Sequence, residues 1–270
     1  WNMYLGNPLE DLETPTYESG SLNYLVTDTI IEGHHVQKLN VRFKVKDNVD
    51  VETGVLRLAK GGDTYSFGDQ WGDYDKKTQT LSIDYLITEY FPTADYYVES
   101  FDVADSAGNF RSVWFSDSPT QEKRKSIHIV TENPDTEAPI LDLNRISVYA
   151  EPTHPEAPDG ETKVTINYYA RDDKAGYNIG YYTLLDPQGI GHSEYHYIPG
   201  RESMFFDGDP TVWTRYTINC ILPKGSAPGI WGLASLDLKD KALNHRTYNF
   251  VETLIFEPDD NMDGYILFSD

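Results

Sequence analysis

Acidic side chains recur at matching places in the two halves of this sequence, where they could hold a hard divalent cation. Ca²⁺ takes about six to eight oxygen ligands, and loops supply them readily. Aspartate and asparagine also form hydrogen-bonded turns, which is the alternative reading of the same residues. The candidate calcium ligands are Glu13, Asp47, Asp102, Asp105 and Asn109 in the first half, and Asp135, Glu137, Asp172, Asp173, Asp237, Asp240 and Asn244 in the second.

A third candidate calcium loop occupies residues 259–270, which follow the pattern Asp-x-Asn-x-Asp-Gly with an acid at position 12. This spacing is typical of a calcium loop, because glycine permits the sharp turn and the last carboxylate closes the coordination shell. That last residue is aspartate here and not glutamate, so a solvated acidic tail is the alternative. The candidate ligands are Asp259, Asn261, Asp263, Tyr265 and Asp270.

The elements that would position these acids belong to an internal repeat. The pattern Ser-x-Asp-x-x-Asp-x-Ala-x-Asn-x-Arg begins at Ser100 and again at Ser235, and Glu13-Thr14-Pro15 is matched by Glu137-Ala138-Pro139. Matched elements in the same order indicate two copies of one domain. The second copy carries extra residues, which we expect around 199–214. We expect an N-terminal segment over 1–12, domains over 13–131 and 139–258, a linker over 132–138 and an acidic tail over 259–270.

Period-two alternation of apolar and polar residues dominates the chain, as in segments 39–46, 80–85 and 163–168. This alternation predicts half-buried strands, and no long stretch shows a helical period, so we predict an all-β fold. The same period places Asp102 on the face of Tyr96 and Val98. It therefore predicts that Asp102, and likewise Asp237, stands at the edge of the core.

The second copy resembles the tandem bacterial immunoglobulin-like, or cadherin-like, modules of large secreted and surface exoproteins and adhesins. The resemblance is carried by Asp172-Asp173, Gly229-Ile230-Trp231 and residues 237–244; the first copy matches more loosely. It implies two tandem immunoglobulin-like β-sandwich domains in a non-catalytic module at the cell surface or outside the cell. Its expected partners are other domains or copies of the same protein. Such a sandwich gathers the candidate ligands of each copy at one pole.

The formal net charge of −22 narrows the classes of partner. Such a charge repels phosphate backbones and anionic membranes, so we expect no nucleic-acid binding and no docking on lipid. No stretch of about 18 apolar residues predicts membrane insertion. Bound calcium would reduce the net negative charge. The sequence contains none of the common catalytic motifs, so we assign no catalytic residue.

Two other functions stay open. A carbohydrate-binding accessory domain of a secreted hydrolase would use exposed rings to stack on polysaccharide, although such rings also fill sandwich cores. An open sheet edge could instead accept a strand from a neighbouring copy and build an extracellular filament. The candidate carbohydrate-binding rings are Trp71, Tyr74, Tyr195, Tyr197 and Trp213.

Overall fold

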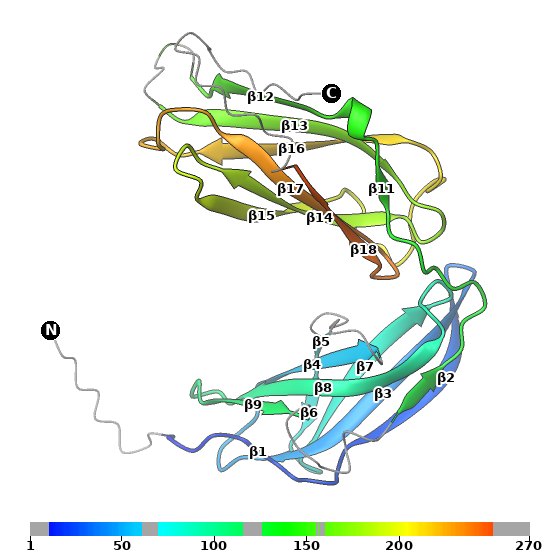
Figure 1. Cartoon of the computed structure of the whole chain (residues 1–270). Helices are drawn as coiled ribbons and strands as arrows, with labels where there is room; N and C mark the ends of the chain where they lie inside the picture. The colour runs from blue at the N-terminus through cyan, green and yellow to red at the C-terminus, as the bar shows by residue number, and fades with distance from the viewer. Residues whose placement is uncertain (1–10, 61–69, 116–125, 155, 157–159, 251–270) are drawn as a thin grey trace, which may run out of the picture. The chain divides into compact units, whose positions relative to one another are not determined.

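The computed structural model describes residues 11–60, 70–115, 126–154, 156 and 160–250 (Figure 1). The chain divides into two compact units, unit 1 over residues 1–134 and unit 2 over residues 135–270. The described residues form antiparallel sheets and contain no α-helix, only the short 3₁₀ helix Leu143–Arg145. The all-β prediction is therefore confirmed. Within these residues no helix is long and apolar enough to cross a membrane.

Unit 1 contains two five-stranded sheets. The first has the order β1-β3-β7-β6, with β2 also paired to β3, and consists of β1 (Thr16–Tyr17), β2 (Asn23–Ile31), β3 (His34–Lys46), β6 (Asp73–Asp75) and β7 (Thr80–Thr88). The second has the order β10-β8-β4-β5, with β9 also paired to β8, and consists of β4 (Thr53–Lys60), β5 (Gln70–Trp71), β8 (Ala94–Ala104), β9 (Phe110–Trp114) and β10 (Ile127–Ile129).

Unit 2 contains two four-stranded sheets. The first has the order β11-β13-β12, with β16 also paired to β13, and consists of β11 (Ile140–Leu141), β12 (Ser147–Pro152), β13 (Thr162–Arg171) and β16 (Thr214–Leu222). The second has the order β15-β14-β17-β18 and consists of β14 (Tyr177–Leu185), β15 (Gly191–Tyr197), β17 (Gly232–Asp240) and β18 (His245–Asn249). The strands expected at 39–46, 80–85 and 163–168 lie within β3, β7 and β13, so these predictions are confirmed.

In each unit the two sheets share one apolar core. Leu39 and Val41 of β3 belong to the same buried cluster as Tyr96 and Val98 of β8. In unit 2, β13 and β17 supply one cluster in the same way. Each fully buried side chain of this size contributes about 1.5–3 kcal/mol, so the shared core holds the two sheets of a unit together.

A β-bulge in unit 1 inverts the alternation on which one sequence prediction relied. The register of β4 against β8 shifts so that Glu99 is the extra residue in β8. After this bulge Phe101 and Val103 are the residues buried in the core. The prediction that Asp102 shares the core face of Tyr96 is therefore wrong, because one extra residue moves every later side chain to the other face.

Unit 2 repeats this bulge in β17. The register against β14 shifts at Ala234, and Leu236 and Leu238 then enter the core. The prediction that Asp237 stands on the core face is wrong for the same reason. Its carboxylate instead accepts hydrogen bonds on the outer face, from residues of the neighbouring strand β18.

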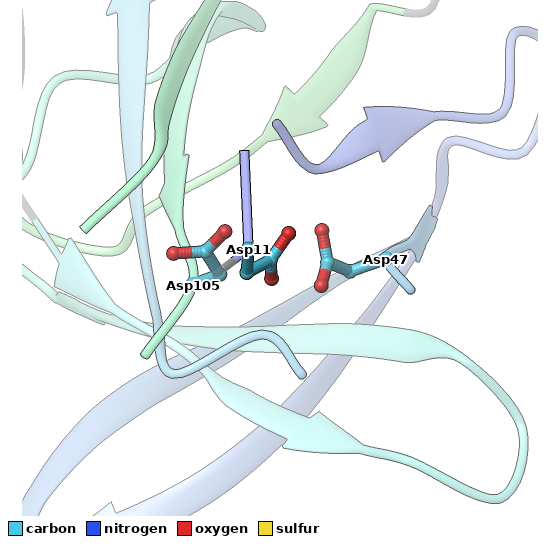
Figure 2. Close-up of side chains that lie close together, drawn as sticks. All are labelled: Asp11, Asp47 and Asp105. Carbon is cyan, nitrogen blue, oxygen red and sulfur yellow. The ribbon is translucent and has the colours of Figure 1, made fainter. Parts of the chain in front are cut away.

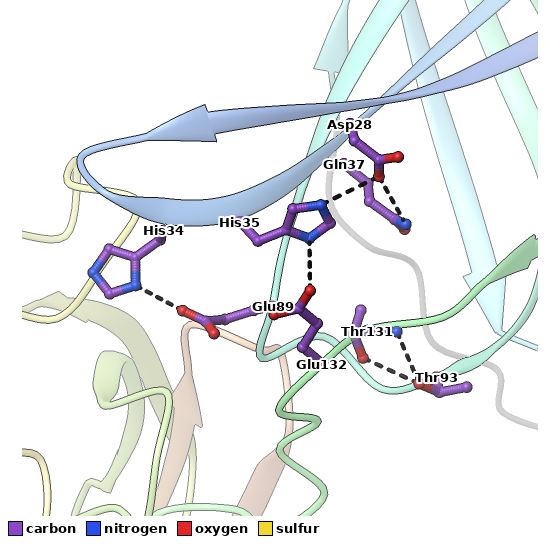
Figure 3. Close-up of polar contacts among 8 residues, drawn as sticks. All are labelled: Asp28, His34, His35, Gln37, Glu89, Thr93, Thr131 and Glu132. Atoms are coloured by element: carbon purple, nitrogen blue, oxygen red, sulfur yellow. Dashed lines mark hydrogen bonds and ion pairs between the residues drawn. The ribbon is translucent and has the colours of Figure 1, made fainter.

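Hydrogen bonds hold the last residues of unit 1 to the loops beside them (Figure 3). Thr131 donates its backbone N–H to the Thr93 hydroxyl at 3.0 Å, and His34 Nδ1 lies 2.7 Å from the Glu89 carboxylate. Asn133 donates its N–H to the backbone carbonyl of Glu89 at 3.2 Å. The first residues of the expected linker are thus held by hydrogen bonds to unit 1.

Candidate metal centre

Three aspartate carboxylates meet in each unit. In both triads, one oxygen of each residue lies within 4.8 Å of the others. One aspartate comes from the segment leading into the unit, one follows β3 or β13, and one lies in the hairpin β8–β9 or β17–β18. The unit 1 triad is Asp11, Asp47 and Asp105, and the unit 2 triad is Asp135, Asp172 and Asp240.

Backbone N–H groups hold two carboxylates of the unit 2 triad. Asp135 Oδ2 accepts from Ala175 N at 2.8 Å, and its Oδ1 accepts from Glu137 N at 3.0 Å. Asp172 Oδ2 accepts from Gly176 N at 2.7 Å. The other oxygen, Asp172 Oδ1, is buried and accepts no hydrogen bond from the described residues. A buried oxygen of this kind costs free energy unless a ligand or a proton binds it.

Asn244 holds the third carboxylate and ties it to the start of the unit. Its backbone N–H and its side-chain Nδ2 each donate to the Asp240 carboxylate at 2.8 Å. Nδ2 also donates to the backbone carbonyl of Asp135 at 3.1 Å. Asn244 therefore positions two members of the triad with its amide nitrogen.

A long loop, residues 198–213, covers the unit 2 triad. Its Pro210 carbonyl accepts the N–H of Asp172 at 2.9 Å, and its Ser203 carbonyl accepts from Lys241 Nζ at 2.7 Å. Gly176 has φ +86, and a Cβ there would collide with the Phe206 ring of the same loop. The extra residues of the second copy lie here, since the corresponding connection in unit 1 spans only 72–79.

Burial dominates the electrostatics of this triad, because Asp135, Asp172 and Asp240 are only 0%, 3% and 0% exposed. It raises the pKa of Asp240 to about 8 and that of Asp172 to about 7, and nearby carboxylates add to both shifts. Burial also raises the pKa of Asp135. Three charged carboxylates in this environment repel one another, so a cation would strongly stabilise their charged form.

The unit 1 triad has the same framework but a less buried setting (Figure 2). Asp11 Oδ1 accepts from the N–H of Glu13 at 3.1 Å and from Asn48 Nδ2 at 3.0 Å. Asp47 Oδ1 accepts two backbone N–H groups. The Oδ2 atoms of Asp11 and Asp47 accept no hydrogen bond from the described part of the chain. Both unpaired oxygens are therefore open to a ligand.

The hairpin of unit 1 repeats the contacts made by Asn244. Asn109 Nδ2 donates to Asp105 Oδ2 at 2.7 Å and to the backbone carbonyl of Asp11 at 3.1 Å. Burial acts to raise the pKa of Asp105, but the hydrogen bonds from Asn109 and the turn backbone outweigh it and lower the pKa. The charged form of Asp105 is thus stabilised by the protein itself.

The remaining acids proposed as ligands are not members of either triad. Glu13, Glu137 and Asp173 are exposed. Asp102 pairs with Arg57 at 2.7 Å, and Asp237 accepts from Thr247. The candidate ligands of the C-terminal loop lie outside the described residues: Asp259, Asn261, Asp263, Tyr265 and Asp270.

Asp11 is not among the candidate ligands from the sequence, because the repeated pattern Glu13-Thr14-Pro15 begins after it. Its signal is nevertheless present. Asp135 stands four residues before Pro139, and Asp11 stands four residues before Pro15. Extending the repeat alignment by two residues finds it.

The five candidate carbohydrate-binding rings fall into two groups. Trp71, Tyr195 and Tyr197 are 68%, 57% and 51% exposed. Arg201 lies over the Tyr197 ring at 4.0 Å and covers one of its faces. Tyr74 is half-buried and packs against the core, and Trp213 carries the Arg171 guanidinium 4.8 Å from its ring centre. Of the five rings, Trp71 of unit 1 and Tyr195 and Tyr197 of unit 2 are therefore the exposed ones.

No protein-family model matches this chain, and no curated protein matches it either.

Proposed function

We propose that the chain is a non-catalytic extracellular structural or adhesive module of two immunoglobulin-like domains, stiffened by calcium at the unit 2 triad. The observation that carries this proposal is the buried oxygen Asp172 Oδ1, which has no hydrogen-bond partner among the described residues. It stands with Asp135 and Asp240 inside a fully buried cluster of carboxylates.

The donor set favours calcium over a softer metal. Both triads offer only carboxylate oxygens, whereas zinc and copper sites usually include histidine or cysteine. Ca²⁺ binds oxygen at about 2.3–2.6 Å, so ligands on opposite sides of the ion stand roughly 5 Å apart. The 4.8 Å limit within each triad is compatible with that spacing.

Calcium at the unit 2 triad would cross-link three distant parts of the sequence. Asp135 precedes the first strand, Asp172 follows β13 and Asp240 ends β17. An ion that holds all three would fix the start of the unit to both of its sheets. Such a role suits a spacer or adhesive unit within a larger surface protein or assembly, where the module must keep its form under load.

Scanning calorimetry of the full chain in excess calcium and in EGTA tests the proposal. A ligand that binds only the folded state adds about 2.7 kcal/mol to stability when its free concentration is about 100 times Kd, so Tm should rise. Magnesium serves as the matched ion, because its shorter bonds and strict octahedral geometry fit a wide carboxylate cluster poorly. Equal Tm values in calcium and EGTA would refute calcium stiffening.

A further inference from the structure

The sheets that contain β8 in unit 1 and β17 in unit 2 carry matching rows of residues on their outer faces. The row of unit 1 crosses β5, β4, β8 and β9 through Trp71, Val55, Asp102 and Ser112. The row of unit 2 crosses β15, β14, β17 and β18 through Tyr195, Tyr181, Asp237 and Thr247. Directly paired residues point to the same side of a sheet, and the neighbours of both aspartates enter the cores, so both rows face outward.

A hydroxyl is held in a fixed orientation at one end of each row. Ser112 donates its O–H to Asp102 Oδ1 at 2.6 Å, and Thr247 donates its O–H to Asp237 Oδ2. Arg57 pairs with the Asp102 carboxylate at 2.7 Å. Ser112 and Thr247 are both exposed. Because the proton of each hydroxyl bonds to a carboxylate, its lone pairs are left to accept a hydrogen bond from a ligand.

Exposed aromatic rings accompany the hydroxyl on the outer face of unit 1. Phe110 and Trp114 stand two residues to either side of Ser112 on β9, so the three side chains point to the same face. Phe110 is 57% exposed and Trp114 is 48% exposed, and Trp71 at the other end of the row is 68% exposed. Three strand spacings, about 14 Å, separate Trp71 from Ser112, so a ligand that contacts both must be extended.

The outer face of unit 2 also has rings at the matching end of its row. Tyr181 and Tyr195 are 39% and 57% exposed, and their ring centres lie 5.1 Å apart. Tyr197 follows on the same face of β15, with its ring centre 6.0 Å from that of Tyr195. The solvated face of an antiparallel sheet is ordinarily polar, so the exposed rings repeated on these two faces indicate a binding surface.

A neutral sugar chain fits this pattern better than the other classes of ligand. Aromatic rings stack on the apolar face of a sugar ring, and sugar hydroxyls donate hydrogen bonds to oriented acceptors. The net charge of −22 disfavours an acidic polymer. The core of a protein interface is depleted of charged residues, whereas the ion pair of Arg57 and Asp102 lies within the unit 1 surface. A polymer of repeated sugar units also suits a surface that the chain itself repeats.

We propose that each outer face binds a neutral, β-1,4-linked polysaccharide. Sugar rings stack on Trp71 in unit 1 and on Tyr195 in unit 2, and a sugar hydroxyl donates to Ser112 or Thr247 at the other end of the row. The β-1,4 linkage is assigned because it gives an extended ribbon, which the length of the row requires. This inference goes beyond the structural role proposed above and does not depend on the calcium site.

Isothermal titration of the full chain with cellohexaose, xylohexaose and mannohexaose tests the inference. At least one of these β-1,4-linked chains should bind, with two chains per protein. Maltohexaose, which is α-linked, should bind at least about tenfold more weakly. Trp71→Ala and Tyr195→Ala should each reduce the stoichiometry from two to one, and the double variant should lose binding, because the stacking ring contributes about a factor of ten or more to each affinity.

The matched control is Tyr149→Ala, because Tyr149 is 45% exposed on β12, in the other sheet of unit 2. It should keep both binding events, and every variant should keep the Tm of the original chain. In the Tyr195→Ala background, Ser112→Ala should weaken the remaining site by about threefold to tenfold, the loss of one hydrogen bond. Ser112→Thr should retain that site, because threonine holds the same place in unit 2.

Four results would overturn the inference. They are no binding of any β-1,4-linked chain, equal affinity for maltohexaose, unchanged binding in the double ring variant, and an equal loss of binding in Tyr149→Ala. Calcium titrated without sugar tests the proposed function separately, so failure of one does not imply failure of the other.

Discussion

The two aspartate triads have the same framework and different surroundings. In each, an asparagine of the hairpin donates its side-chain N–H to the hairpin aspartate and to the carbonyl of the first aspartate, at distances that agree within 0.1 Å. In unit 2 the loop 198–213 lies over this framework. In unit 1 the hydrogen bonds lower the pKa of Asp105, whereas in unit 2 burial raises the pKa of Asp240 to about 8.

This difference shows that the hairpin and its asparagine place the carboxylates, while the loop decides how much they need a cation. In the unit 1 triad Asp105 is buried, but Asp11 and Asp47 are partly exposed, so water partly stabilises their charge. A fully buried triad loses that hydration, and its charged form then depends on a bound ion or a proton. We therefore expect calcium to matter much more to unit 2 than to unit 1.

The substitution Asp172→Asn should produce the largest effect, and its sign should depend on calcium. In EGTA at pH 8.5 it removes one of three buried charges, so unit 2 should gain roughly 1–3 kcal/mol. In excess calcium it removes a ligand, so the calcium-dependent rise in Tm should largely disappear. Calorimetry in EGTA and in excess calcium measures the change in unit 2 stability under each condition.

Asp47→Asn is the matched control, because Asp47 holds the corresponding position in the less buried unit 1 triad. It should change the stability of unit 1 by less than about 1 kcal/mol under either condition, as expected for a partly exposed side chain. If Asp172→Asn destabilises unit 2 equally with and without calcium, the carboxylate is structural and the comparison between triads fails.

The pH dependence without calcium should give the next largest effect. Asp172 and Asp240 have folded pKa values of about 7 and about 8, above the unfolded value of 3.8. The folded state therefore holds protons that the unfolded state has released, and this stability is lost as the pH rises through 7 and 8. In EGTA the Tm of unit 2 should fall between pH 6.5 and 8.5, because its free energy of unfolding falls by at most about 1.4 kcal/mol per pH unit for each proton, and by less as each group ionises.

The measurement starts at pH 6.5 because a buried histidine makes stability depend on pH in the opposite direction at lower pH. Burial lowers the pKa of His196 below 6.5, so its contribution is present at higher pH and is lost as the pH falls through its folded pKa. The unfolding transition of unit 2 is the one whose Tm changes in the Asp172→Asn variant. In excess calcium the fall above pH 6.5 should vanish; a Tm that rises with pH in EGTA would contradict the assignment of raised pKa values.

The hairpins themselves should give the smallest effect. Gly108 of unit 1 has φ +86, and the corresponding Leu243 of unit 2 has φ +73. A non-glycine residue in this region is strained by roughly 1–2 kcal/mol, although glycine also loses more entropy on folding. Leu243→Gly should therefore raise the stability of unit 2 by about 0.5–1 kcal/mol, measured by urea unfolding. The reciprocal Gly108→Leu should destabilise unit 1, and the comparison is wrong if both changes destabilise.

Period-two alternation predicts the all-β fold, and the repeat predicts five of the six triad residues: Asp47, Asp105, Asp135, Asp172 and Asp240. The sixth residue, Asp11, falls in the expected N-terminal segment 1–12, because the repeated pattern Glu13-Thr14-Pro15 begins after it. Glu13 and Glu137 belong to the same predicted set of ligands, and each donates its backbone N–H to an aspartate of a triad. Sequence spacing identifies which loop approaches a site but not which atom of that loop faces it.

The strand faces, the loop over the unit 2 triad and a cavity in unit 2 depend on three-dimensional features that the sequence repeat does not encode. A single extra residue at Glu99 or Ala234 reverses the faces of a strand, and neither residue type marks a bulge. The cover over the unit 2 triad depends on contacts between distant residues, such as Lys241 with Ser203. Arg171 and Arg246 line this cavity although they are far apart in sequence, and the repeat, which includes Arg246, does not indicate that Arg171 lies near it.

The position of Asp135 has a mechanical consequence. It is the first residue of unit 2 and directly follows Pro134, so tension carried along the chain arrives there before it reaches β11. Its backbone carbonyl is held by Asn244 and its carboxylate by Ala175, which means that the first bonds to bear the pull are those of the triad framework. A calcium ion at this point would cross-link the first residue of unit 2 to the rest of the unit. Its dissociation rate would then set the force at which the leading segment detaches.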